Sequence, residues 1–256
     1  MKVWPIFKKE MLLYFSSPVA YAVITLFLLI VGYFFYLYFV SFTLMSMQAA
    51  MNPGLARDLN VTDGILRPLF ANIVSIIVLF MMPMLTMRLF AEERKSGTIE
   101  LLLTYPVRDG AVLIAKYLAA LVLYAIMLAL TLLYPVMIAY FARLEWGPLF
   151  TGYLGLLLMG GAFLAVGLLA SSLTENQIVA AFATFVVLLI FWVIGWSADY
   201  TGGLAGRVLS HLSLVDHFES FSKGVIDSRD VIYYADFMVL ALFLTLRSLE
   251  ARRWKG

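Results

Sequence analysis

Long apolar runs, each about as long as a bilayer-spanning helix, dominate the chain. A bilayer core requires roughly 20 apolar residues in helical form. Six runs meet this requirement: Val19–Val40, Pro68–Met87, Ala111–Phe141, Leu149–Leu173, Ile178–Ser197 and Val231–Leu249. They predict an all-α integral membrane protein with six transmembrane helices in a single domain over residues 1–256. The third run is long and contains Pro135, so we expect a kink or tilt in it.

Composition supports a membrane class and excludes several others. The chain is 63% hydrophobic and 13% charged, whereas soluble domains carry about 25% charged residues. A net charge of +2 gives no indication of nucleic-acid binding. The chain has no cysteine, which excludes disulfides, thiolate metal sites and cysteine nucleophiles.

The distribution of basic residues predicts the orientation. If the N-terminus is inside, 12 of the 18 Lys and Arg residues lie on the inner side. These are Lys2, Lys8, Lys9, Arg88, Arg94, Lys95, Arg108, Lys116, Arg247, Arg252, Arg253 and Lys255. Because inner loops carry the excess of positive charge, we expect both termini in the cytoplasm.

The segment before the first span has the pattern of a surface helix. Apolar residues between Trp4 and Ser17 recur near helical spacing, and Lys8 and Lys9 are available for lipid head groups. Pro5 and Pro18 bound the segment. We therefore predict an amphipathic interfacial helix within residues 1–18, and the alternative is a frayed cytoplasmic tail.

The segment 198–230 is predicted to lie outside, with amphipathic pieces around Leu209–Phe221. His211 and His217 occur there with Asp216 and Glu219 nearby, which is a conceivable metal cluster. Their spacing matches no common ligand pattern, so ordinary polar surface is the alternative interpretation.

The predicted spans are almost free of ionisable residues. None occurs in 68–87, 117–142, 146–174 or 176–198. Proton-coupled carriers usually need such a residue at membrane depth, so a secondary carrier is disfavoured. Asp236 is the one acid inside a span, near its outer end, where we expect a structural or interfacial role. The sequence also has no P-loop motif, so any energy must come from a partner.

A charged insert, Ala91–Lys116, separates the second and third spans. It opens with the polar residues Glu92, Glu93, Arg94 and Lys95, continues through Gly97, Thr98 and Glu100 to the apolar Leu101 and Leu102, and ends near Pro106 and Asp109. Glycine allows a close approach or a sharp change of direction, Thr98 can cap a helix, proline ends it, and Asp109 is expected to cap the third span. One interpretation is a short rigid rod that seats in a groove on a partner. The other is a solvated loop with an interfacial helix.

The same insert resembles the permease family of type-2 ABC transporters. The family pattern E-E-R-x-x-G-T-x-E-x-L-L-x-x-P is matched by residues 92–106. Lys9-Glu10, Tyr14–Pro18, His217–Glu219 and Gly224–Asp227 further resemble the gliding-motility and nitrous-oxide-reductase-maturation branches of this family.

This resemblance implies a six-helix permease that pairs with a second copy or a related permease. Two copies of a cytoplasmic ABC ATPase would bind the ATP and Mg²⁺, with no cofactor and no catalysis in this chain. Segment 91–109 would hold the coupling helix Glu92–Thr104, and residues 198–230 would form short re-entrant helices. The implied ATPase-coupling residues are Glu92, Glu93, Arg94, Gly97, Thr98, Glu100, Leu101 and Leu102, with a second contact at Thr174, Glu175 and Asn176.

Two functions follow from the resemblance and stay open. The first is the permease of an ATP-driven exporter in the plasma or inner membrane of a bacterium or archaeon. The second is a mechanotransmission or scaffold subunit that relays ATPase motion to a partner at the outer, periplasmic face without transport. The substrate is not encoded in any motif that we recognise.

Overall fold

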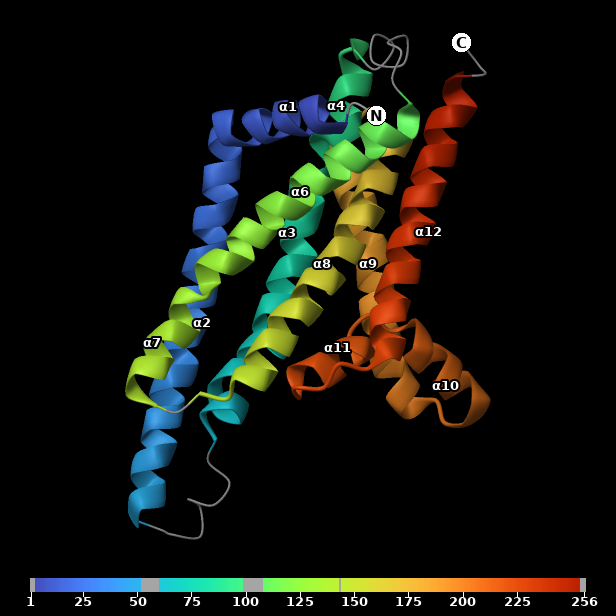
Figure 1. The fold of residues 1–256 in the computed structure, drawn as a ribbon. Helices are drawn as coiled ribbons and strands as arrows, with labels where there is room; N and C mark the ends of the chain where they lie inside the picture. Colours follow the sequence, from blue (N-terminus) through green and yellow to red (C-terminus); the bar gives the residue numbers. More distant parts are fainter. Residues whose placement is uncertain (1–2, 52–59, 99–107, 143, 254–256) are drawn as a thin grey trace.

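Helices form nearly all of the part of the chain that the computed structural model describes, residues 3–51, 60–98, 108–142 and 144–253 (Figure 1). The helices are α1 (Val3–Ser16), α2 (Pro18–Met51), the π-helical η2 (Thr62–Leu66) and η3 (Leu69–Val74), α3 (Ser75–Thr86), α4 (Arg88–Lys95), α6 (Asp109–Thr131), α7 (Leu133–Phe141), α8 (Trp146–Leu173), α9 (Gln177–Tyr200), α10 (Gly203–Leu212), α11 (Asp216–Ser222) and α12 (Ser228–Arg253). Within these residues, six helical segments are long and apolar enough to cross a membrane. The predicted all-α class and the six spans are therefore confirmed.

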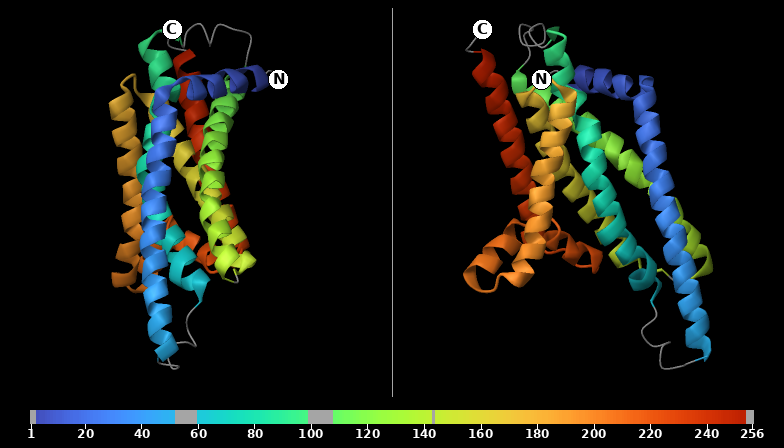
Figure 2. Two further views of the ribbon diagram at one scale, coloured as in Figure 1. Left: turned by 90° about the vertical axis from the view of Figure 1, so that its left-hand side faces the viewer. Right: turned by 180° about the vertical axis from the view of Figure 1, so that it is seen from behind.

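Both termini lie at the same end of the bundle, which we call the terminus end (Figure 1). Helix α1 lies across this end and meets α2 at a steep angle, while α4 stands beside it. The short helices α10 and α11 lie toward the other, distal end, and α10 projects sideways from the bundle (Figure 2). The terminus end thus carries α1 and α4, the distal end carries α10 and α11, and the apolar spans lie between the two ends.

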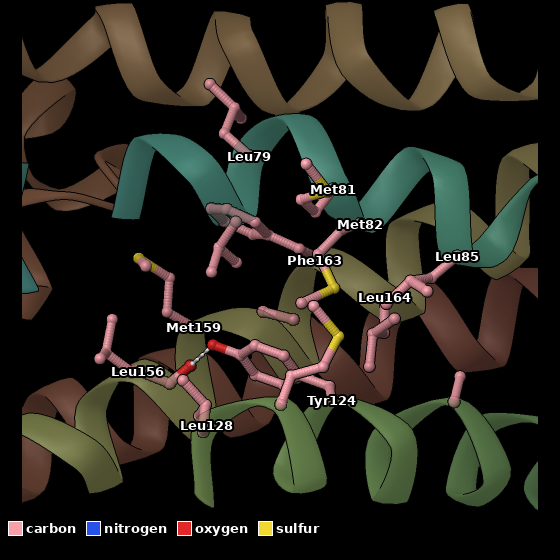
Figure 3. Packing of buried hydrophobic residues seen from close by; sticks show 14 of the residues in the cluster. Leu79, Met81, Met82, Leu85, Tyr124, Leu128, Leu156, Met159, Phe163 and Leu164 are labelled. Atoms are coloured by element: carbon pink, nitrogen blue, oxygen red, sulfur yellow. Dashed lines mark hydrogen bonds between the residues drawn. The ribbon is translucent and has the colours of Figure 1, made fainter. Parts of the chain in front are cut away.

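Helix α8 forms the centre of the packing. It lies between α3 and α6 and also contacts α9, α11 and α12. Its side chains Leu156, Met159 and Phe163 are completely buried, and Figure 3 shows them between the neighbouring helices. Tyr124 of α6 donates a hydrogen bond to the Leu156 carbonyl oxygen at 2.8 Å. Its ring packs against Gly160, where no side chain separates the two helices.

The first two spans are longer than predicted. Helix α2 continues to Met51 rather than ending at Val40. The polar Thr43 does not stop it, because its hydroxyl donates to the Phe39 carbonyl at 2.8 Å. The second span begins at Thr62, before the predicted start. Hydropathy marks the part of a helix that is apolar, and a helix can continue beyond it.

The third span is interrupted close to the place where a kink or tilt was predicted. Helices α6 and α7 are separated at Leu132, whose amide bonds to the Ala129 carbonyl at 3.1 Å. Pro135 has no amide hydrogen for the carbonyl of Thr131, so regular α-helical bonding cannot pass this point.

The segment between the fifth and sixth spans contains two separate helices. They meet at the link 213–215, which falls in the middle of the amphipathic stretch predicted around Leu209–Phe221. Asp236 is exposed on α12. Its expected structural or interfacial role stays a prediction.

Candidate functional site

The polar helix α4 continues the second span at the terminus end, and Gly97 follows it. Gly97 has a φ of 70°, a left-handed conformation that favours glycine, so regular α-helix does not continue through it. The Thr98 hydroxyl lies 2.8 Å from the Ser96 hydroxyl and donates to the Glu93 carbonyl at 3.3 Å. Thr98 therefore helps to close the end of α4.

Arg94 connects α4 to the end of α8 and to the following turn. Its Nη1 donates to the Ser172 carbonyl at 2.8 Å, and its Nη2 lies 3.3 Å from Glu175 Oε1. A guanidinium group at the last carbonyls of a helix is favoured by the helix dipole. The sequence suggested two separate contact segments, and the structure joins them through this side chain.

The turn that contains Glu175 is itself held by local hydrogen bonds. Asn176 Oδ1 accepts from the amides of Ile178 at 2.9 Å and Val179 at 3.4 Å, which caps the start of α9. The Thr174 hydroxyl accepts from the Asn176 amide at 3.1 Å. Thr174 and Asn176 thus shape the turn, and Glu175 is left to bind Arg94.

Ser171 forms a second connection between α4 and α8. Its buried hydroxyl accepts from the amides of Phe90 and Ala91, each at 3.0 Å, and donates to the Met87 carbonyl at 3.0 Å. Met87 lies at the junction of α3 and α4. The serine therefore fixes the start of α4 against the central helix.

Lys116 of α6 joins three helices through buried charges. Its ammonium lies 2.8 Å from Glu10 Oε1 on α1 and 2.9 Å from Glu93 Oε1 on α4. Lys9 adds a longer contact to Glu93, at 3.6 Å. The ammonium also lies 5.3 Å from the centre of the Phe90 ring. Lys116 is only 1% exposed, so these partners must replace the water that would otherwise solvate its charge.

Helix α1 is further attached to α3 and α4 through Tyr14. The Tyr14 hydroxyl donates to the Leu85 carbonyl at 3.0 Å, and the Arg88 guanidinium lies 4.9 Å from the centre of its ring. Burial raises the pKa of Tyr14 far above its usual value, so the hydroxyl keeps its proton at physiological pH. Arg88 also donates to the Ser17 hydroxyl at 3.3 Å. The predicted N-terminal helix is thus a packed part of the bundle.

A polar cavity of about 580 Å³ lies between α1 and α4. Its lining includes Lys9, Glu10, Arg88, Glu92 and Glu93. Glu93 Oε2 is buried there and has no hydrogen-bond partner within the described residues. Lys116, Glu10 and Glu93 thus form an ion-paired joint between α1, α4 and α6, and the polar cavity lies beside this joint.

The structure places the predicted site residues as follows. Glu92, Glu93, Arg94, Gly97, Thr98, Thr174, Glu175 and Asn176 all lie at the terminus end. Glu100, Leu101 and Leu102 lie outside the described residues. Asp109 was expected to cap the third span, but Arg108 occupies the cap position and Asp109 is the first residue of α6.

Sequence reasoning missed Glu10, Lys116 and Ser171 as parts of this site. One signal was available, since Lys116 directly precedes the charge-free stretch 117–142 of the third span. Such a lysine needs a counter-charge if it is buried. Its partner Glu10 is 106 positions away, so the pairing itself required the fold.

The two distal histidines lie close to each other, with 5.6 Å between their ring centres. No group of three or more His, Cys, Asp or Glu side chains that could hold a metal ion occurs in the parts of the chain that are described. His217 instead forms a close contact with Asp230, at 2.7 Å between Nδ1 and Oδ1.

Comparison with known families assigns the chain to a family. A model of the ABC-2 family of transporter proteins matches residues 4–203, which include α1 except Val3, α4 and the turn after α8. The chain belongs to the ABC-2 transporter family. No curated protein matched the chain.

Membership of the ABC-2 family supplies the general role. Together with the six apolar helices, it identifies the chain as a transmembrane ABC permease, a multi-pass membrane component. It also implies an ABC ATPase as partner and a lipid bilayer as surroundings.

Proposed function

We propose that this chain is the permease subunit of an ATP-driven exporter, and that the ATPase docks at the terminus end. The observation that carries the proposal is the joint around α4. This short helix contacts three other helices. Glu93 forms ion pairs with α1 and α6, and Arg94 and the Phe90 amide form hydrogen bonds with α8. A partner that pushes on α4 would therefore move several spans together.

Each connection has a distinct mechanical role in this proposal. Lys116 transmits a displacement of α4 to α6 and α1, because both carboxylates share its ammonium. Arg94 and Ser171 transmit it to the central helix α8. The coupling segment Glu92–Thr104 shares Glu92–Lys95 with α4, and its remaining residues would supply the surface that enters the ATPase.

The proposed assembly contains further partners. Two ATPase subunits bind ATP and Mg²⁺ on the cytoplasmic side, and a second permease copy, identical or related, completes the path between the spans. Helices α10 and α11 act as the re-entrant pair that closes the outer exit. The complex would lie in a bacterial or archaeal plasma or inner membrane. The matches at Lys9-Glu10 and His217–Glu219 favour the gliding-motility and nitrous-oxide-reductase-maturation branches.

A mechanotransmission role is the second candidate. The same joint would relay ATPase motion to α10 and α11 at the outer face, and a periplasmic partner would receive it there. The projection of α10 from the bundle favours this candidate (Figure 2). A wide, solvent-open cavity between two permease copies supports transport, and a closed, dry interface supports transmission.

Reversal of the charge of Glu100 is expected to weaken ATPase docking. For Glu100→Lys, we expect the amount of ATPase that co-purifies with the permease to fall roughly tenfold. The ATPase groove is expected to offer a basic group to Glu100, and a lysine facing that group would cost at least about 1.4 kcal/mol of binding free energy. Gly97→Leu is expected to act similarly, because leucine does not tolerate the φ of 70° at this position. Co-purification and permease-stimulated ATP hydrolysis are the two measurements.

Glu250→Lys is the matched control. Glu250 lies on α12 and pairs with Arg247 at 2.8 Å, a contact between exposed groups that contributes little to stability. This variant should retain docking. Wild-type values in both measurements for Glu100→Lys and Gly97→Leu would rule out the proposed docking segment.

The orientation is tested with single cysteines, since the natural chain has none. We expect Lys2→Cys to stay unmodified when an impermeant thiol reagent is applied to intact cells, and to react after permeabilisation. Lys223→Cys, on the opposite side, should react from outside without permeabilisation. The reverse pattern would place the termini outside and overturn the proposed docking side.

A further inference from the structure

We propose that His217 and Asp230 form a proton-binding site at the distal end, and that the bound proton holds α10 and α11 against α12. The site is separate from the joint around α4. It faces the outside under the proposed orientation, but its chemistry does not depend on that orientation.

The hydrogen bonds of His217 require an extra proton. Its Nδ1 lies 2.7 Å from Asp230 Oδ1, and its Nε2 lies 3.1 Å from the carbonyl oxygen of His211. Both partners are acceptors when the aspartate is ionised, and a neutral imidazole has only one N–H group. Both contacts are satisfied only if the pair holds one proton more than a neutral histidine and a carboxylate. The proton resides on the imidazole as imidazolium, or on Asp230 beside a neutral ring.

The surroundings of the pair favour this extra proton. The side chains of His217 and Asp230 are 11% and 10% exposed, and Asp230 Oδ2 has no partner among the described residues. An ionised, poorly hydrogen-bonded carboxylate is costly in such a place unless a cation compensates it. The Tyr233 ring stacks on the imidazole, with 3.8 Å between ring centres, which favours a cationic ring. The carbonyl of His211 belongs to the last turn of α10, where the helix dipole also favours a cation.

A cavity gives the pair access to solution. It measures about 680 Å³ and is lined by charged or titratable groups of α10, α11 and the start of α12. These are Arg207 and His211 of α10, Asp216 and His217 of α11, and Asp227, Arg229 and Asp230 at the start of α12. The Tyr233 hydroxyl also belongs to the surroundings and donates to the Leu212 carbonyl at 2.8 Å. Protons can therefore exchange between the pair and the surrounding water.

The pair bridges elements that have few other polar links. His217 connects the last turn of α10 to Asp230 of α12, and two tyrosines add parallel bonds, from Tyr233 to Leu212 and from Tyr234 to the Leu214 carbonyl at 2.6 Å. When the extra proton leaves, a neutral His217 can donate to only one of its two acceptors. The other contact then becomes a repulsion between lone pairs, which loosens α10 and α11 from α12.

The test uses the purified full-length protein. The chain has two histidines, and His211→Gln leaves His217 as the one imidazole signal while the carbonyl at position 211 is kept. With ¹⁵N-labelled histidine, we expect the ring nitrogens to report the extra proton at the acidic end of a series from about pH 5 to pH 8. Its loss should speed amide hydrogen exchange in residues 203–222 by about tenfold, after correction for intrinsic pH dependence.

Asp230→Asn removes the carboxylate and should abolish this pH-dependent change in exchange. Asp236→Asn on the same helix is the control, because Asp236 is exposed, and it should retain the change. If Asp230→Asn does not fold, the ¹⁵N spectra and the amide exchange of His211→Gln over the pH series decide whether the proposal holds. The proposal is overturned if His217 carries one N–H and Asp230 is ionised throughout the series, or if exchange in residues 203–222 does not follow the loss of the proton.

Discussion

Replacement of Lys116 by methionine is expected to reduce the free energy of unfolding by about 3–5 kcal/mol, the usual cost of removing one partner from a buried ion pair. The cost arises because Glu10 and Glu93 lose the ammonium that they share. Glu10 is 5% exposed, so water cannot readily take the place of the lysine. Chemical denaturation of the purified permease in detergent micelles gives the measurement.

Two variants separate this effect from a general loss of charge. Lys95→Met removes an exposed lysine at the same end of the molecule and should change the free energy of unfolding by less than about 0.5 kcal/mol. The double variant Glu10→Met/Lys116→Met removes both partners of the shorter contact, so it should be more stable than Lys116→Met alone. A denaturation midpoint of Lys116→Met equal to that of the wild type would show that the buried pair contributes nothing.

The same variant also tests the joint as a transmission element. If α1, α4 and α6 move as one unit, Lys116→Met in folded protein should lower permease-stimulated ATP hydrolysis while the ATPase still co-purifies. Glu100 follows α4 in the sequence and belongs to the proposed docking surface, whereas Lys116 contacts α4 from the side of α6. The Glu100 variant should therefore lose both properties, and the Lys116 variant should lose only the second.

The sequence predicts the parts of this molecule that depend on local pattern. Apolar runs located all six spans, Pro135 predicted a kink or tilt near the break at Leu132, and Gly97 adopts a left-handed conformation that favours glycine. The limits of the first span were less accurate. The polar residue Thr43 follows the apolar run and suggests that the helix ends there. Its hydroxyl donates a hydrogen bond to the Phe39 carbonyl within the helix, so α2 continues.

Contacts between distant segments were not predictable in the same way. Lys116 and Glu10 are ordinary basic and acidic residues in the sequence, and only the packing of α1 on α6 shows that they pair. Likewise, Arg94 and Glu175 were each predicted to contact a partner protein. The structure shows that they contact each other, which links the two predicted docking segments.

The centre of the bundle depends on the absence of a side chain at Gly160 of α8. A Cβ atom at this position would overlap the ring of Tyr124, which is completely buried and bonded to the Leu156 carbonyl (Figure 3). Backbone and ring therefore touch directly, and α6 can pack close to α8. We expect Gly160→Val to reduce the free energy of unfolding by about 3 kcal/mol, at the upper end of typical overpacking effects, because neither helix can move without disturbing the core.

The control lies on the same helix. A Cβ atom at Gly147 would meet no atom of the described residues within 4 Å outside its own helix turn, so Gly147→Val should be nearly neutral. Adding Tyr124→Leu, which shortens the opposing side chain, should make the loss in the Gly160→Val background smaller than the sum of the two single losses. Denaturation of the four proteins in the same micelles completes the cycle. Strict additivity would mean that the ring does not oppose the valine, and that the close approach of α6 and α8 does not require glycine.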